Sequence, residues 1–285
     1  MSERLSFFKM SGAGNDFLVA DNRHEEWSAF DLPKLARGLC RRAFSVGADG
    51  LVLLEPSARA AYALRILNSD GSASPMCGNG ARCAARFAAL NGTFEGRTLF
   101  EAGGQVLSAE LLPSGDVRVE LPGRAATPRR LDVSLEGRLV QGFHTDSGVP
   151  HFVVFVRDLK AVPLQAFGRA LRFAPEMGEG GANVDFVSAG IEMPFAMRTY
   201  ERGVEGETLA CGTGATAVAW VLYSLGKAGR AVKILAASGK ELLVEIDPDP
   251  ASGNPFRLSG EARVVYEGHL SPESIKEALA CSAAV

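Results

Sequence analysis

The chain carries the same short motif twice, and this duplication limits what it can fold into more than any other feature. The segments MCGNGARCAARFAAL, from Met76, and ACGTGATAVAWVLYSL, from Ala210, both read Cys-Gly-x-Gly-Ala and continue with small residues typical of a helix. Their cysteines, Cys77 and Cys211, lie 134 positions apart (211 − 77). Self-similarity at a fixed offset indicates a repeated structural unit.

Four further pairs of segments keep the same order at offsets of 133 to 136 residues. They are SGAGNDFLVAD at 11 with SGVPHFVVFV at 147, GADGLVLLE at 47 with GANVDFVSA at 181, YALRILNSDG at 62 with FAMRTYERG at 195, and LFEAGGQVLSAEL at 99 with ILAASGKELLVEI at 234. Glycine-rich turns that resemble one another by chance do not share an order. We therefore predict two copies of one domain, with the boundary in LPGRAATPRR, from Leu121 to Arg130.

Hydrophobic patterning predicts many strands and few helices. Helices are expected after the cap residue Asp31, after each cysteine motif (ending near Gly92 and Gly226), over 163–171, and from Ser271 onward. Short alternating or apolar runs predict strands at FLVAD, GLVLLE, YALRIL, DVRVEL, HFVVFV, VDFVSA, FAMRTY, ELLVEI and ARVVYE. This balance predicts an α+β fold with segregated layers.

Composition excludes several classes of function. The chain has 285 residues, is 47% hydrophobic and carries a net charge of −3 without any basic run, so no nucleic-acid partner is expected. No apolar stretch is long enough to span a membrane or to form a signal-peptide core. Five scattered cysteines make a poor disulfide framework, which favours the cytoplasm. Without a CxxC or HExxH pair, no metal site is predicted.

The position of each cysteine just before a predicted helix suggests chemistry. Free N–H groups and the helix dipole stabilise negative charge there, which favours thiolate and should lower the pKa of Cys77 and Cys211. The neighbouring glycines allow close approach of a ligand, and the amides can bind a carboxylate. Two copies facing each other about a pseudo-twofold axis would place the two thiols across one cleft.

Inversion of a stereocentre needs an acid and a base on opposite sides of one carbon. A thiolate and a thiol can exchange these roles, and this chemistry requires no metal or cofactor. The residues therefore suggest a cofactor-independent amino-acid racemase or epimerase. Polar residues on predicted turns could bind its substrate, although each also suits an ordinary turn or a solvated surface pair. They are Asn15, Asn68, Asn79, Asn183 and the pair Glu201-Arg202.

Over nearly its whole length the sequence resembles the diaminopimelate epimerases. The resemblance is carried by KMSGAGNDFLVAD, VGADG, LNSDGSASPMCGNGARCAARF, GVPHFV, GANVDFV and TYERGVEGETLACGTGATA. It implies interconversion of LL- and meso-2,6-diaminopimelate, a small amino-acid substrate, in lysine and peptidoglycan precursor biosynthesis. It also implies a PLP-independent homodimer of two mirror-related domains with the active site between them. The last strand, 262–268, would return to the first domain, so that the domains comprise 1–126 with 263–285, and 127–262.

The family resemblance also assigns roles to single residues. Cys77 and Cys211 would be the acid/base pair, and His151 and Glu201 would support the protonation geometry. The substrate would be held by Asn15, Asn68, Asn183, Glu201 and Arg202, and its reacting carboxylate by the amides of Gly78, Asn79, Gly212 and Thr213. The other cysteines, Cys40, Cys83 and Cys281, are expected to be packing residues or incidental.

Three positions depart from the family pattern and leave alternatives open. Val149 stands where members often carry asparagine, ERGVEGET is one residue longer than the usual ERGxGET, and Gly50 replaces a glutamine found in some members. The alternatives are another two-cysteine racemase, acting on proline, hydroxyproline or another amino acid, and a non-catalytic amino-acid-binding relative. Redox sensing through a disulfide between the two thiols is a third.

Overall fold

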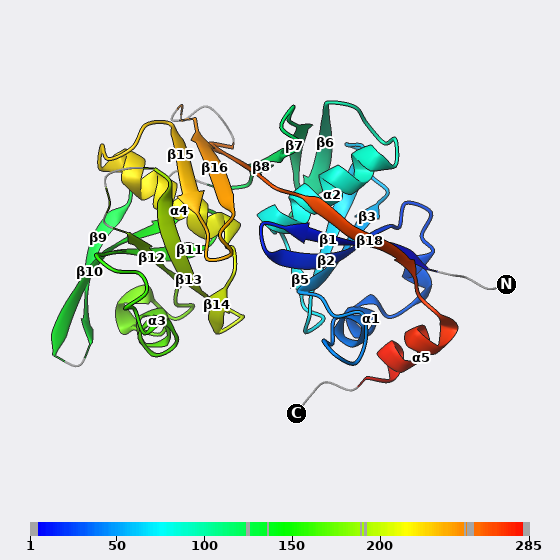
Figure 1. Cartoon of the computed structure of the whole chain (residues 1–285), viewed down its shortest axis with the longest axis horizontal. Helices are drawn as coiled ribbons and strands as arrows, with labels where there is room; N and C mark the ends of the chain where they lie inside the picture. Colours follow the sequence, from blue (N-terminus) through cyan, green and yellow to red (C-terminus); the bar gives the residue numbers. More distant parts are fainter. Residues whose placement is uncertain are drawn as a thin grey trace. The chain divides into compact units, whose positions relative to one another are not determined.

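The computed structural model describes residues 5–123, 126–135, 137–188, 190, 193–247, 249 and 254–281. The chain forms two compact units: unit 1 comprises Met1–Val119 and Glu261–Val285, and unit 2 comprises Glu120–Gly260 (Figure 1). The predicted boundaries, after residues 126 and 262, fall slightly later in the chain, and the predicted linker includes residues 124 and 125, which lie outside the described part. Each unit combines a mixed sheet with few helices, which confirms the α+β class.

Unit 1 is built on a mixed sheet in the order β18-β1-β2-β3-β4-β6-β7-β8, with β5 also paired to β4. Pairs β2–β3 and β4–β6 are parallel, and the others are antiparallel. The strands are β1 (Ser6–Gly12), β2 (Asn15–Asp21), β3 (Gly50–Glu55), β4 (Tyr62–Asn68), β5 (Ala73–Ser74), β6 (Arg97–Ala102), β7 (Gln105–Leu111), β8 (Val117–Leu121) and β18 (Arg263–His269).

Helices cover the central strands of unit 1 on both faces. Leu51 and Leu53 of β3 belong to the core formed with α1 (Leu32–Leu39) and α5 (Pro272–Ala280). Val52 points to the opposite face, 3.4 Å from where a Cβ on Gly80 would lie, toward α2 (Gly78–Leu90). Because both faces are buried, GLVLLE is continuously apolar rather than alternating.

Caps begin the outer helices of unit 1, as the sequence predicts. Asp31 accepts a hydrogen bond from the Lys34 amide at the start of α1, and Ser271 accepts one from the Ser274 amide at the start of α5. A short 3-10 turn, η1 (Trp27–Ala29), precedes α1.

Unit 2 is built on a sheet in the order β9-β10-β11-β12-β13-β15-β16-β17, with β14 also paired to β13. Pairs β11–β12 and β13–β15 are parallel. The strands are β9 (Arg129–Leu135), β10 (Arg138–Asp146), β11 (Pro150–Val156), β12 (Asn183–Ser188), β13 (Phe195–Glu201), β14 (Gly206–Thr208), β15 (Ala231–Leu235), β16 (Glu241–Ile246) and β17 (Phe256–Gly260).

The two units share one succession of strand pairings. From β1 to β8 and from β10 to β17, antiparallel and parallel pairs follow each other in the same order. The registers correspond as well, since Phe17 pairs with Gly50 as Phe152 pairs with Val184. Two copies of one domain would have this relationship.

The helices of unit 2 lie close to the predicted positions. They are α3 (Leu164–Arg172), η2 (Pro175–Met177) and α4 (Gly212–Ser224). Successive side chains of β12 point to opposite faces of the sheet. Val184 and Phe186 pack in the core with α3, and Asp185 lies against Gly214 of α4. Within the described residues, every helix is too short or too polar to cross a membrane.

Candidate functional site

In unit 1, Cys77 occupies the N-cap of α2. Its backbone is extended (φ −140°, ψ 115°), and its Sγ accepts a hydrogen bond from the Gly80 amide at 3.5 Å. Cys77 is half-buried, whereas the residues of α2 that follow it directly are buried. The predicted helix position of Cys77 is confirmed, and the first-turn amides next to it have no intrahelical carbonyl to bind.

A chain of hydrogen bonds fixes two predicted asparagines beside Cys77. Arg82 Nη2 donates to Asn79 Oδ1 (2.7 Å), and Asn79 Nδ2 donates to Asn15 Oδ1 (2.5 Å). Asn15 Nδ2 then donates to Asp49 Oδ2 (2.9 Å). Because a guanidinium only donates and a carboxylate only accepts, this succession determines how both amides are oriented.

The remaining predicted residues of unit 1 lie at strand and helix ends. Gly78 is the first residue of α2. Asn68 ends β4 and is exposed, and its Nδ2 donates to Ser72 Oγ at 2.9 Å, within a turn. The Asn68 side chain is thus bonded within its own turn and not, among the described residues, to the asparagine pair beside Cys77. Gly12 of β1 is required for close packing, since a Cβ there would lie 2.8 Å from the Asn79 carbonyl oxygen.

In unit 2, Cys211 occupies the N-cap of α4 in the same way. Its Sγ accepts from the Gly214 amide at 3.3 Å and lies 3.4 Å from Thr213 Oγ1. The predicted lowering of its pKa is wrong: burial, followed by the nearby carboxylates of Glu201 and Asp185, raises the pKa of Cys211 well above its ordinary value. The Gly214 amide, which donates to the Cys211 sulfur, acts in the opposite direction without outweighing them.

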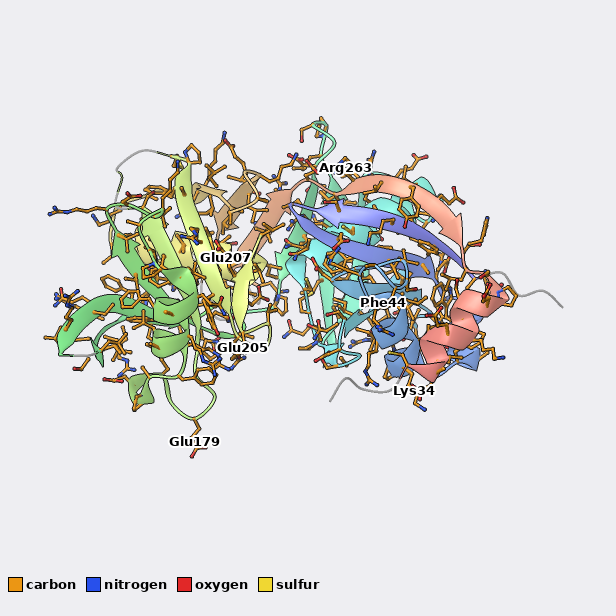
Figure 2. The ribbon with its side chains drawn as sticks, turned by 60° about the horizontal axis from the view of Figure 1, so that its bottom comes forward. Lys34, Phe44, Glu179, Glu205, Glu207 and Arg263 are labelled. Carbon is orange, nitrogen blue, oxygen red and sulfur yellow. The ribbon has the colours of Figure 1, made fainter. Side chains whose placement is uncertain are left out.

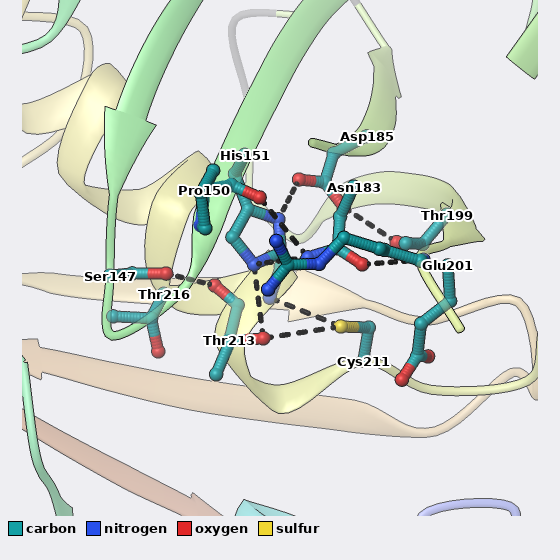
Figure 3. A network of polar contacts seen from close by, with 12 residues as sticks. Ser147, Pro150, His151, Asn183, Asp185, Thr199, Glu201, Cys211, Thr213 and Thr216 are labelled. Carbon is teal, nitrogen blue, oxygen red and sulfur yellow. Dashed lines mark hydrogen bonds and ion pairs between the residues drawn. The ribbon is translucent and has the colours of Figure 1, made fainter. Parts of the chain in front are cut away.

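The orientation of Asn183 determines which nitrogen of His151 accepts a hydrogen bond. Asn183 Oδ1 accepts from the Arg202 amide (2.8 Å), and Nδ2 donates to the Pro150 carbonyl (3.1 Å). The same Nδ2 lies 3.4 Å from His151 Nε2 (Figure 3). An amide nitrogen offers only donors, so His151 Nε2 is the acceptor and the ring proton is on Nδ1.

His151 therefore links a buried carboxylate to the Cys211 thiol (Figure 3). Its Nδ1 donates to Asp185 Oδ2 at 2.7 Å, and both side chains are completely buried. Its Nε2 accepts from Thr213 Oγ1 at 3.0 Å. The Thr213 hydroxyl has one proton, which it gives to His151, so toward Cys211 it acts as the acceptor and the thiol donates.

The structure brings the predicted residues of unit 2 together around α4. Glu201, the last residue of β13, accepts from Thr208 Oγ1 through Oε2 at 2.7 Å. Arg202 follows it and is held by Asn183 through its backbone amide. Gly212 is the first residue of α4.

The longer segment 201–208 is anchored at two points. Glu205, in the left-handed region (φ 55°), accepts from Arg172 Nη2 at 3.2 Å and from Tyr200 Oη at 3.3 Å. Glu207 pairs with Arg198 at 2.7 Å. Figure 2 labels both glutamates on this segment. The segment with the extra residue therefore forms a turn that hydrogen bonds and an ion pair hold in place, and Glu201 is its first residue.

Three residues that take part in these contacts were not predicted from the sequence. Asp185 and Thr199, bonded to each other at 2.7 Å, support His151, and Arg82 orients Asn79. A charged residue inside an apolar strand (Asp185 in NVDFVS) or inside a small-residue helix (Arg82 in GNGARCAA) was the available signal. Gly214 was expected to let a ligand approach the backbone, but Asp185 lies there instead. A Cβ added at Gly214 would be only 2.5 Å from Asp185 Oδ1.

Both units thus present a thiol at a helix N-terminus, next to amides that carry partial positive charge. Such a site can bind a carboxylate and can exchange a proton with a carbon beside it. The electrostatic surroundings of the two thiols differ, since buried Arg82 accompanies Cys77 and two carboxylates accompany Cys211.

The chain is similar to known proteins over most of its length. The family profile described as diaminopimelate epimerase matches residues 7–124 and 143–254. The diaminopimelate epimerase of Aquifex aeolicus (strain VF5) is 39% identical over 282 residues, covering 95% of this chain and 100% of the relative. That of Archaeoglobus fulgidus is 36% identical over 285 residues, covering 94% and 96%.

Solved structures share the fold at low sequence identity. A hydroxyproline epimerase from Agrobacterium vitis superposes with a TM-score of 0.70 at 16% identity, covering 96% of each chain. A phenazine biosynthesis protein of the PhzF family from Bacillus anthracis gives 0.68 at 13% identity, covering 94% of this chain and 99% of the other. At these identities the likeness shows the fold alone.

Proposed function

Because the chain belongs to the diaminopimelate epimerase family, we propose that it interconverts LL- and meso-2,6-diaminopimelate. Membership makes it an isomerase that acts as an amino-acid epimerase. The proposal adds the substrate, a place in cytoplasmic lysine and peptidoglycan precursor biosynthesis, and action as a homodimer. The observation that carries it is the presence of a thiol at the N-cap of an equivalent helix in each unit.

In the proposed mechanism, Cys77 and Cys211 act on opposite faces of the substrate's α carbon. One thiolate takes the α proton and becomes a thiol, and the opposite thiol gives its proton to the other face and becomes a thiolate. The atoms balance without an external acid or base, and the reverse reaction uses the same groups in exchanged roles. No cofactor has a step in this scheme.

The carbanion formed between these steps needs its charge stabilised. The amides of Gly78 and Asn79 in α2, and of Gly212 and Thr213 in α4, belong to first turns, where backbone N–H groups lack helical partners. Fixed dipoles of this kind, aimed at the substrate carboxylate, stabilise the enolate-like state without reorganisation.

We propose that charged and amide side chains that differ between the two units recognise the substrate. Diaminopimelate has a second amino-acid head, and Glu201 and Arg202 offer it opposite charges. The asparagines complete the set: Asn15, Asn68 and Asn183. Asn15 and Asn183 are already oriented by hydrogen bonds, which supports recognition by pre-oriented amides. His151 and Glu201 support the protonation geometry in this proposal.

A substrate panel tests the proposal. The reduced protein is incubated with LL-diaminopimelate, L-proline or trans-4-hydroxy-L-proline, and isomers are separated by chiral chromatography. We expect meso-diaminopimelate to form at the highest kcat/KM. Faster turnover of proline or hydroxyproline would assign the protein to the other two-cysteine racemases, and binding without turnover would assign a non-catalytic relative. The Cys40→Ala variant is the matched control, because burial raises the pKa of Cys40 to about 12 and keeps it unreactive.

A further inference from the structure

A buried cation lies beside the proposed catalytic thiol of unit 1. Arg82 is completely buried in α2, and its guanidinium donates to the Gly78 carbonyl (3.4 Å) and to Asn79 Oδ1 (2.7 Å). Within the described part of the chain, the Arg82 Nε has no hydrogen-bond partner, and no carboxylate forms an ion pair with this guanidinium. Burying a charge without a counter-charge is costly, and a cation at a helix N-terminus opposes the helix dipole.

Two thiols and, more weakly, one carboxylate supply negative charge near Arg82. Burial lowers the pKa of the Arg82 guanidinium, and charge on Cys83, Cys77 and, more weakly, Asp116 acts against that lowering. Burial raises the pKa of Cys83 to about 12, so at neutral pH Cys83 stays protonated. Cys77 is half-buried at the helix N-terminus and accepts the Gly80 amide, so it is the thiol best placed to carry the negative charge.

The equivalent position in unit 2 carries no charge. Thr216 follows Cys211 by five residues, as Arg82 follows Cys77, and its hydroxyl donates to the Gly212 carbonyl at 2.9 Å. Cys211 instead faces the carboxylates of Glu201 and Asp185. The hydrogen bonds described above also make Cys211 the donor toward Thr213, which requires a protonated thiol.

We propose that Arg82 is a positioning residue that keeps Cys77 as the thiolate of the resting enzyme, while Cys211 rests as the thiol. The inference deepens the proposed function and rests on it. Cys77 then removes the first α proton, and Cys211 donates to the opposite face. After product leaves, Cys77 is the thiol and Cys211 the thiolate, so one proton must pass from Cys77 to Cys211 through solvent to restore the resting form.

Alkylation without substrate tests this assignment, so its outcome is separate from that of the substrate panel. The full-length reduced protein is treated with iodoacetamide across a pH series, and mass spectrometry of the peptides gives the rate at each cysteine. In the wild type, we expect the Cys77 rate to rise with pH at a lower midpoint than the Cys211 rate. A Cys77 midpoint at or above that of Cys211 would overturn the proposal.

Variants at position 82 separate charge from packing. Arg82→Met removes the charge and should raise the Cys77 midpoint by about one pH unit or more while leaving that of Cys211 in place. Arg82→Lys retains the charge and should leave the Cys77 midpoint below that of Cys211. Thr216→Val, at the equivalent position, is the matched control and should not move Cys77. A folded Arg82→Met protein with an unchanged Cys77 midpoint would contradict the proposal, and if this variant does not fold, the wild-type and Arg82→Lys midpoints decide.

Discussion

The substitution Asp185→Asn changes one oxygen of a completely buried carboxylate into an NH2 group. In the wild type Asp185 receives two hydrogen bonds of 2.7 Å, from His151 Nδ1 and from the Thr199 hydroxyl. An asparagine can accept only one of them, because its nitrogen donates. If the nitrogen faces His151, the ring proton must move to Nε2, and Thr213 must turn its proton toward Cys211.

The size of the effect follows from these two bonds. A hydrogen bond to a charged group contributes about 1.5–3 kcal/mol, and Asp185→Asn loses one such bond. We therefore expect the free energy of unfolding to fall by about 1.5–3 kcal/mol. If the His151 ring adopts the other tautomer, the transition state loses a stabilisation of similar size. We then expect kcat to fall roughly 10- to 100-fold.

Thr199→Val is the matched control, because it removes the second bond to Asp185 and leaves His151 in place. Urea unfolding, epimerase kinetics and ¹⁵N NMR of the histidine ring are measured for both variants. Asp185→Asn should show the Nε2–H tautomer and the larger loss of kcat, and Thr199→Val should mainly lose stability. A wild-type ring already protonated at Nε2 alone, or an Asp185→Asn variant with unchanged kcat, would show that Asp185 does not fix the His151 tautomer in this way.

Two further predictions concern packing and pH. Gly214→Ala places a Cβ 2.5 Å from Asp185 Oδ1, so we expect a loss of about 1–3 kcal/mol in urea unfolding; Gly229→Ala, with no atom within 4 Å, should be neutral. Burial raises the pKa of Asp16, but hydrogen bonds from Arg42 and Lys9 hold it below its ordinary 3.8. Ionised Asp16 therefore stabilises the fold above pH 3.8, and this stabilisation is lost as the pH falls through the lowered pKa. Asp16→Asn should lower the free energy of unfolding at pH 7, and its difference from the wild-type value should narrow toward pH 3.

Local signals made part of this fold predictable. Apolar runs such as GLVLLE became strands, Asp31 and Ser271 cap helices, and the two cysteine motifs begin α2 and α4. These features depend on neighbours in sequence, so the sequence contains them directly.

Local signals do not show which strands pair when they are far apart in the sequence. The β9–β10 hairpin was not predicted, because its segments RRLDVSL and RLVQGFHTD are largely polar and exposed. In unit 1 the corresponding neighbour of β1 is β18, from the other end of the chain. Its pairing with β1 is invisible to hydrophobic periodicity.

In the candidate site, too, local features could be predicted from the sequence and long-range contacts could not. The motif repeat identified both thiols, but their different surroundings depend on residues brought in by folding. Asp185 comes from β12 and Glu201 from β13, and together with burial they reverse the pKa shift expected for Cys211 from its helix position alone. A helix dipole acts locally, whereas burial and distant carboxylates are properties of the folded unit.

Proton transfer by two separate thiols is tested by the reaction in deuterium oxide. Wild-type protein is mixed with LL-diaminopimelate, and substrate and product are analysed by mass spectrometry at low conversion. Because Cys77 removes the proton and Cys211 delivers one from solvent, we expect deuterium at the inverted carbon of the meso product and essentially none in the remaining LL substrate. Deuterium entering the remaining substrate as fast as the product would show that a single group serves both faces, and would rule out transfer by two separate thiols.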